Sequence, residues 1–126
     1  MSMGLSDLES TRHMKWGQLH QNYETRTNAG QTVGANTYQI DTESLGRIAT
    51  TLAELRSGKV NPHGGFWVDI VNAKVTVDDS EATTLLEALV AGRLAVDQHY
   101  LDTRDSINQA TTESELDAID VGFTGV

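Results

Sequence analysis

Apolar side chains recur at steps of three, four and seven residues between Ser80 and Ala110, which is the spacing of one helix face. The stretch has no proline and one glycine, Gly92, and Asp79 or Ser80 can cap its first turn. Such a helix would run ~46 Å, whereas a globule of this chain length is ~36 Å across. We therefore expect it to bend near Gly92, to project from the body, or to find a second partner for its apolar stripe. The stripe contains Leu86, Leu89, Val96, Tyr100 and Ile107.

A second helix is predicted from Ser6 to about Thr27, where Ser6 and Glu9 fit a capping box. Its apolar stripe is thin, and Arg12 interrupts it. Asn28-Ala29-Gly30 provides the stop signal. We expect residues 1–29 to form an arm that contributes little to the fold and binds a neighbour. The side chains expected at that interface are Trp16, Leu19 and Tyr23.

The middle of the chain alternates turn signals with short apolar runs. Residues 31–40 predict a hairpin around Gly34-Ala35-Asn36, and residues 42–57 predict a helix that stops at Gly58. Residues 66–71 and 74–77 predict a second hairpin, whose first strand is apolar on both faces apart from Asp69 and should therefore be an inner strand. After the long helix, Thr112 and Glu115 fit another capping box ahead of a short helix. The glycine-broken last residues, 121–126, should be mobile or lie on a neighbour.

This order of elements predicts an α+β fold in which small antiparallel hairpins pack on amphipathic helices. One long helix, at about residues 80–110, and an N-terminal helical arm complete the prediction. We expect two regions, the arm at residues 1–29 and one α+β domain at residues 30–126. The apolar stripe of the long helix is wider than one short helix and two small hairpins can cover, so a homo-oligomer is expected.

Composition excludes several classes of function. The formal charge of -9 and nine scattered Lys and Arg residues argue against a nucleic-acid or anionic-membrane partner. The absence of cysteine excludes disulfides and thiolate chemistry. No apolar stretch approaches the ~20 residues that span a bilayer, and the first ten residues lack the pattern of a signal peptide. We expect a soluble, acidic protein that is made and kept in a cytoplasm unless a larger particle carries it out.

Histidines are the only candidates for catalysis or metal binding, and each has a simpler explanation. His13 and His20 are ~10 Å apart along one helix, too far to share a metal ion. His99 could pair with Asp102 on one helix face, but no nucleophile is fixed beside them. His63 lies in a Pro-His-Gly-Gly turn without the lysine of a phosphate-binding loop. We therefore expect no enzyme activity, no cofactor and no metal.

Three segments of the sequence resemble a family of phage proteins. The first, YQIDTE at residues 38–43, leads into a helix. The second runs from Phe66-Trp67 through a turn at Asn72 to KVTVDDSEA at residues 74–82. The third is the ending INQATTESELDAI at residues 107–119. Together they are similar to an uncharacterised C-terminal domain of tailed-bacteriophage tail and tail-fibre-associated proteins. The resemblance covers about residues 30–120.

The resemblance implies a non-enzymatic structural or interaction protein of the virion tail, associated with a fibre or baseplate. Its expected partner is a phage tail or fibre protein, and it would oligomerise through the long helix. The alternative is a tail-fibre assembly chaperone that is absent from the mature virion. Mass spectrometry of purified virions separates these two hypotheses.

Overall fold

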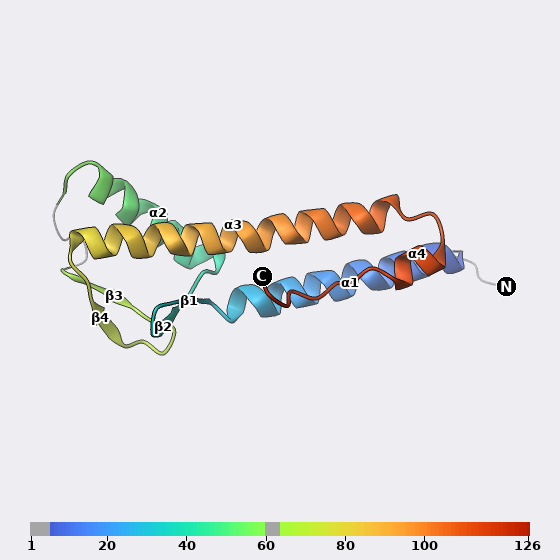
Figure 1. Cartoon of the computed structure of the whole chain (residues 1–126), viewed down its shortest axis with the longest axis horizontal. Coiled ribbons are helices and arrows are strands. Elements are labelled where there is room, and N and C mark those ends of the chain that lie inside the picture. Colours follow the sequence, from blue (N-terminus) through green and yellow to red (C-terminus); the bar gives the residue numbers. More distant parts are fainter. Residues whose placement is uncertain (1–5, 60–63) are drawn as a thin grey trace. The chain divides into compact units, whose positions relative to one another are not determined.

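The computed structural model describes residues 6–59 and 64–126. Over these residues the chain is α+β, which confirms the predicted fold class (Figure 1). It divides into two compact units: a middle unit, Thr27–Leu94, and a terminal unit, which joins residues up to Arg26 with Ala95–Val126. The elements are α1 (Asp7–Asn28), β1 (Gln31–Val33), β2 (Asn36–Tyr38), α2 (Thr42–Arg56), β3 (Phe66–Val68), β4 (Lys74–Thr76), α3 (Asp79–Gln109) and α4 (Glu113–Asp117).

The core of the middle unit forms between α2 and the first half of α3. Ile48 and Leu52 of α2 belong to one buried cluster with Leu86 and Leu89 of α3. Their spacings of four and three residues place each pair on one face of its helix, as the sequence predicts. Ile40 is fully buried in the same cluster. The first half of the α3 stripe is therefore covered within the chain.

Both hairpins are antiparallel and lie in the middle unit. Gln31 pairs with Tyr38 in the first hairpin, and Trp67 pairs with Val75 in the second. A main-chain hydrogen bond from Ile70 to the oxygen of Thr37 (2.8 Å) connects the two hairpins. The two predicted hairpins are thus confirmed, although each strand has only three residues.

The prediction of an inner strand from Phe66 to Val71 is wrong. β3 ends at Val68 because the side chain of Asp69 accepts hydrogen bonds from the backbone N–H groups of Val71 (3.0 Å) and Ala73 (2.9 Å). These bonds close a turn in which Val71 is 78% exposed. The tight turn also uses Asn72 at a positive φ of 69°, as the sequence predicts. Pro62 and His63, in the preceding predicted loop, lie outside the described residues.

The N-cap of α3 is Asp78, one residue before the predicted position. Asp78 Oδ1 accepts from the N–H of Glu81 (2.7 Å), and Glu81 Oε1 accepts from the N–H of Asp78 (3.1 Å). This reciprocal capping box satisfies two donors that the first turn would leave free. The predicted Ser6 and Thr112 caps are confirmed, with bonds to Glu9 (3.2 Å) and Glu115 (3.1 Å).

The terminal unit packs α1 against the second half of α3 and against α4. Leu19 of α1 is 1% exposed and shares a buried cluster with Ile107, Ala110 and Leu116. The sequence predicted residues 1–29 as an arm without a large role in the fold. In the structure, however, most of this stretch supplies one side of a core. The second half of the α3 stripe is therefore also covered within the chain.

Arg12 explains why the stripe of α1 looks interrupted in the sequence. Its side chain is buried, and its guanidinium donates hydrogen bonds to the main-chain oxygens of Ile107 and of Ala110, the latter at 3.0 Å. Ile107 lies in the last turn of α3 and Ala110 directly follows that helix, where the carbonyl groups have no partners within the helix. A charged residue on the packed face of α1 thus caps the C-terminus of α3.

The segment after α4 follows α1 within the terminal unit (Figure 1). Val121 and Phe123 pack against the cluster around Leu19. The sequence predicted that this segment is mobile or lies on a neighbour. In the structure its neighbour is α1 of the same chain.

Candidate functional site

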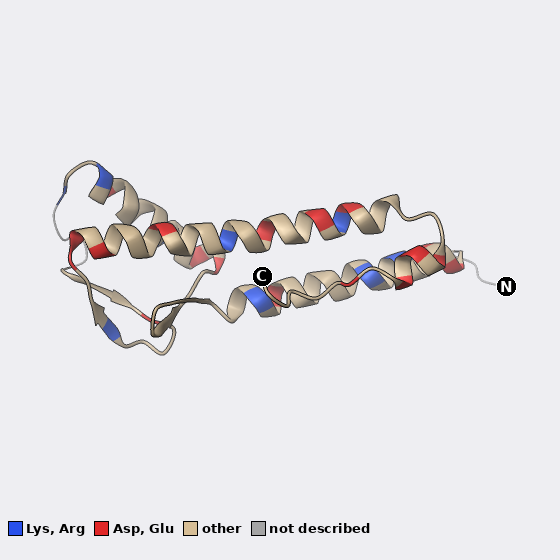
Figure 2. Cartoon of the chain, in the orientation of Figure 1, with Lys and Arg blue, Asp and Glu red and all other residues tan. Residues whose placement is uncertain are grey.

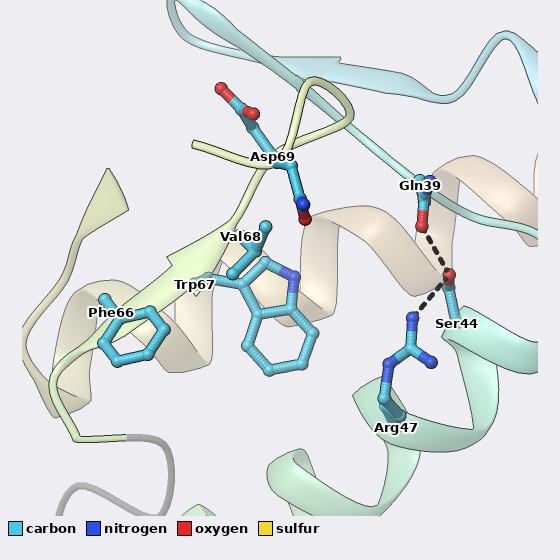
Figure 3. A pocket seen from close by; sticks show the side chains of 8 residues that line it. Gln39, Ser44, Arg47, Phe66, Trp67, Val68 and Asp69 are labelled. Carbon is cyan, nitrogen blue, oxygen red and sulfur yellow. Dashed lines mark hydrogen bonds between the residues drawn. The ribbon is translucent and has the colours of Figure 1, made fainter. Parts of the chain in front are cut away.

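A pocket of about 280 Å³ opens on the middle unit and is the candidate functional site (Figure 3). Three stretches form it: the end of the first hairpin, the first two turns of α2, and β3 with the turn that follows it. The pocket therefore has one polar side and one aromatic side. Its lining residues are Gln39, Ser44, Arg47, Phe66, Trp67, Val68, Asp69 and Asn72.

The aromatic side comes from β3. Phe66 and Trp67 are half-buried, and Trp67 also packs against the core of the middle unit. The ammonium group of Lys74, on the paired strand, lies 4.6 Å from the centre of the Phe66 ring. This contact and the core packing hold the two rings in place. The pocket consequently has an apolar wall on a regular element.

The polar side is a short chain of hydrogen bonds at the start of α2. The hydroxyl of Ser44 donates to Gln39 Oε1 (3.3 Å), and Arg47 Nη2 donates to the same hydroxyl (3.1 Å). Arg47 also forms an ion pair with Glu43 at 3.5 Å, in which its side chain remains 52% exposed. An exposed ion pair contributes little stability. The guanidinium is therefore oriented while part of it stays accessible to a ligand.

The pocket lining contains one basic side chain, Arg47, and one acidic side chain, Asp69. Burial, and then the nearby charge of Asp69, raise the pKa of Tyr38. Asp69 uses one carboxylate oxygen to hold the turn after β3. In the described part of the chain, acidic side chains occur on all four helices (Figure 2). Arg47 is thus a local cation on a protein with a net charge of -9.

Asp41 positions the polar side because it is the N-cap of α2. Its side chain accepts from the N–H of Ser44 at 3.0 Å. Interaction with the Ser44 side chain is the main reason why the pKa of Asp41 lies below its usual value of 3.8, and the bond from the Ser44 N–H lowers that pKa further. We expect Asp41→Ala to lower the free energy of unfolding by about 1 kcal/mol at neutral pH.

The pH dependence of this cap has a defined sign. A carboxyl group whose pKa is lowered by folding stabilises the protein above its unfolded pKa, and loses that contribution as the pH falls through its folded pKa. Asp41→Asn keeps an acceptor but removes the titration. Urea unfolding of both proteins from pH 7 to pH 3 should show the wild type losing more stability below about pH 4. Parallel curves would contradict this role of Asp41.

The hydroxyl group in the pocket, that of Ser44, has no base among its hydrogen-bond contacts with Gln39 and Arg47, neither of which can remove its proton. Across the described residues, no three His, Cys, Asp or Glu side chains are placed to hold a metal ion. Within the same residues, no helix is long and apolar enough to cross a membrane.

The described histidines have structural contacts. His99 Nε2 lies 2.8 Å from the main-chain oxygen of Gly122, and its ring contacts Phe123 edge-on. Asp102, considered above as a partner of His99, accepts instead from Gln98 (2.8 Å). His20 is exposed and lies 3.1 Å from Glu24. The structure therefore holds His99 through the C-terminal segment.

The side chains that the sequence assigned to an interface do not form one surface. Leu86 and Leu89 are buried in the core of the middle unit, and Leu19 and Ile107 in that of the terminal unit. Val96 has no exposed surface. Trp16, Tyr23 and Tyr100 are half-buried, with hydrogen bonds from Trp16 Nε1 to Asn108 (2.9 Å) and from the Tyr23 hydroxyl to Asp97 (2.5 Å). Their contact with a partner stays a prediction.

Sequence reasoning placed Trp67 in a core and assigned no residue of the pocket to a binding site. Only Asp69, the one charged residue in FWVDIV, gave a signal, because a carboxylate in an otherwise apolar strand marks a break or a site. Gln39 and Arg47 look like ordinary surface residues in the sequence. They become part of a site only through the packing of α2 beside β3.

Comparison with known proteins gives one family. The family described as "Domain of unknown function (DUF4376)" matches residues 10–120. No curated protein matches the chain, and no solved structure matches it. The matched range includes most of α1 and all of both hairpins, α2, α3 and α4.

Proposed function

We propose a binding function for this chain, which belongs to the family described as "Domain of unknown function (DUF4376)". In this proposal the chain is a non-enzymatic interaction protein of a bacteriophage tail. Its pocket in the middle unit receives part of a fibre or baseplate protein. The observation that carries the proposal is the pairing of Trp67 and Phe66 with the accessible guanidinium of Arg47 in one pocket.

The residue types in the pocket are those that dominate protein interfaces. Tryptophan and arginine are enriched among the residues that contribute most to binding energy, because both offer a large planar surface and directed hydrogen bonds. A volume of about 280 Å³ lies at the lower limit for small-molecule sites. It suits one side chain of a partner better than a whole cofactor. Val71, exposed on the turn beside the pocket, can extend the contact.

The charge at the pocket indicates which side chain a partner would place there. The guanidinium of Arg47 can form two parallel hydrogen bonds with a carboxylate. The Trp67 and Phe66 rings provide the apolar surface beside it. We therefore propose a partner segment in which a carboxylate is flanked by an apolar residue.

The phage-tail setting is supported by the sequence resemblance alone. The Ile107-to-Ile119 ending and the tryptophan hairpin carry that resemblance. The proposed location is the virion tail, after synthesis in the host cytoplasm. If purified virions lack the protein while it still binds a fibre protein, the assembly-chaperone alternative replaces the structural role.

Photocrosslinking tests the function and captures the partner in the same experiment. A benzophenone amino acid at Val71 should crosslink a fibre or baseplate protein in host cells infected with the phage that encodes the chain. The matched control is the same replacement at Met14, an apolar residue that is also exposed (53%) but lies on α1. Mass spectrometry of the adducts identifies the partner.

Two results of this experiment would contradict the proposal. One is a tail-protein adduct that forms as readily at Met14 as at Val71. The other is the absence of any tail-protein adduct at Val71 when the protein is folded and abundant.

A further inference from the structure

The C-terminal segment, residues 119–126, is bound to α1 largely through its main chain. Three side chains on α1 donate hydrogen bonds to main-chain oxygens of the segment, and a histidine of α3 contacts a fourth oxygen. The pairs are Lys15 with Ile119 (3.0 Å), Asn22 with Val121 (3.0 Å), Arg26 with Val126 (2.7 Å) and His99 with Gly122 (2.8 Å). Main-chain oxygens are present whatever the side chain, so these bonds select a main-chain path, which ends in a turn from Phe123 to Val126, more than a sequence.

One aromatic slot adds side-chain specificity. The Phe123 ring lies 4.8 Å from the ring of His99 and 6.2 Å from that of Tyr23, measured between ring centres. Tyr100 completes the slot, with its ring 4.7 Å from Tyr23. Tilted and edge-on contacts of this kind are favourable. The groove therefore recognises a segment that follows this main-chain path and has an aromatic residue at one position.

We propose that this groove, formed by α1 and the second half of α3, is also a docking site for the C-terminal segment of a second copy of the chain. A second copy supplies the same main-chain oxygens and the same phenylalanine, so exchange of the segments preserves the four main-chain contacts and the ring contacts of Phe123. Such exchange is a low-cost route between copies of one protein. This inference is independent of the pocket and of its proposed function.

Concentration decides which segment occupies the groove. A short connection gives the chain's own segment an effective concentration in the millimolar range. The closed form should dominate in dilute solution. Exchange should become measurable when copies approach millimolar concentrations, as they would if several were held together in one assembly.

Cysteine crosslinking between full-length chains tests the exchange. The chain has no cysteine, so single substitutions give single reactive thiols. Thr25→Cys on α1 and Thr124→Cys in the segment replace exposed residues that flank the paired positions. With a short bifunctional thiol reagent, a mixture of the two variants should give a crosslinked heterodimer whose yield rises with concentration. The double variant should crosslink within one chain when dilute.

Phe123→Ala should have opposite effects in the two partners. In the chain that carries Thr124→Cys, it weakens the incoming segment and should lower heterodimer yield about tenfold. In the chain that carries Thr25→Cys, it loosens the resident segment and should raise the yield. Phe123→Leu provides a milder change if the alanine variant does not fold.

Crosslinking by random collision between chains would give different heterodimer yields from those expected for exchange. It would make the yield insensitive to which chain carries the Phe123 substitution. A control with Ala53→Cys on α2 in place of Thr124→Cys measures this background. Heterodimer yields equal to the background, or equal effects of Phe123→Ala in both partners, would overturn the proposal.

Discussion

Ile107→Asp is expected to abolish cooperative folding of the terminal unit. The Ile107 side chain has no exposed surface and packs with Leu19 and Leu116. Loss of a buried isoleucine side chain costs about 2–5 kcal/mol, and an unpaired carboxylate in its place adds several more. The sum approaches or exceeds the whole stability of a small domain, about 5–15 kcal/mol. Circular dichroism during urea unfolding should show a lost or much earlier transition.

The matched control is Leu101→Asp, on the same helix. Leu101 is 47% exposed, so the same change in charge should cost less than about 1 kcal/mol. Light scattering coupled to size exclusion tests the alternative from the sequence, in which the stripe of α3 holds an oligomer together. If Ile107→Asp dissociated an oligomer into stable, folded monomers, burial within one chain would not explain this residue.

Gly30→Ala is expected to destabilise the middle unit by about 3 kcal/mol or more, from positive-φ strain and overpacking together. Gly30 has a φ of +80°, and a Cβ atom there would lie 2.5 Å from the main-chain oxygen of Tyr38. It would also lie 3.0 Å from Cδ1 of Ile70. Backbone is the nearest neighbour, so a side-chain rotation cannot relieve the overlap. Urea unfolding at constant pH measures the loss.

Gly34→Ala separates the effect of backbone conformation from that of crowding. Gly34 has a similar φ of +64° in the adjacent hairpin turn, but a Cβ atom there would have no neighbour within 4 Å. Only the conformational cost of about 1–2 kcal/mol should remain. Equal losses for the two variants would show that the close approach of Tyr38 to Gly30 does not contribute.

The sequence predicted the elements of this fold well because their signals are local. Capping residues such as Ser6 and Thr112, the stop at Gly58 and the Asn72 turn act within a few residues. The long helix followed from its unbroken stripe. The inner strand failed because the Asp69 side chain bonds to its own turn, which a pattern of apolar positions does not reveal.

The pattern of apolar positions predicts that a helix face is buried, but it does not predict which element packs against that face. The α3 stripe indicated a buried face, and an interface seemed necessary because no single helix could cover it. Two helices cover it instead, α2 in the middle unit and α1 in the terminal unit. The thin stripe of α1 was misleading because Arg12, Lys15 and Asn22 lie on its packed side and bond to main-chain oxygens.

The pocket was beyond prediction for a related reason. Gln39 and Arg47 are separated from Trp67 and Asp69 by 20 to 30 positions in the chain, and no short motif connects them. Only the packing of α2 beside the second hairpin brings an arginine to an aromatic wall. Residue types alone gave no reason to prefer Arg47 over any other arginine.

Binding of the partner found by crosslinking to two charge-reversal variants tests the central claim most directly. Arg47→Glu should weaken binding at least about tenfold, because it removes the cation that faces the partner's carboxylate and adds repulsion. Arg56→Glu is the matched control, since Arg56 lies on the same helix in a similarly exposed ion pair at 3.5 Å. Isothermal titration calorimetry should show Arg56→Glu within about twofold of wild type. Equal affinities for the two variants, with both folded, would contradict the assignment of the pocket as the partner site.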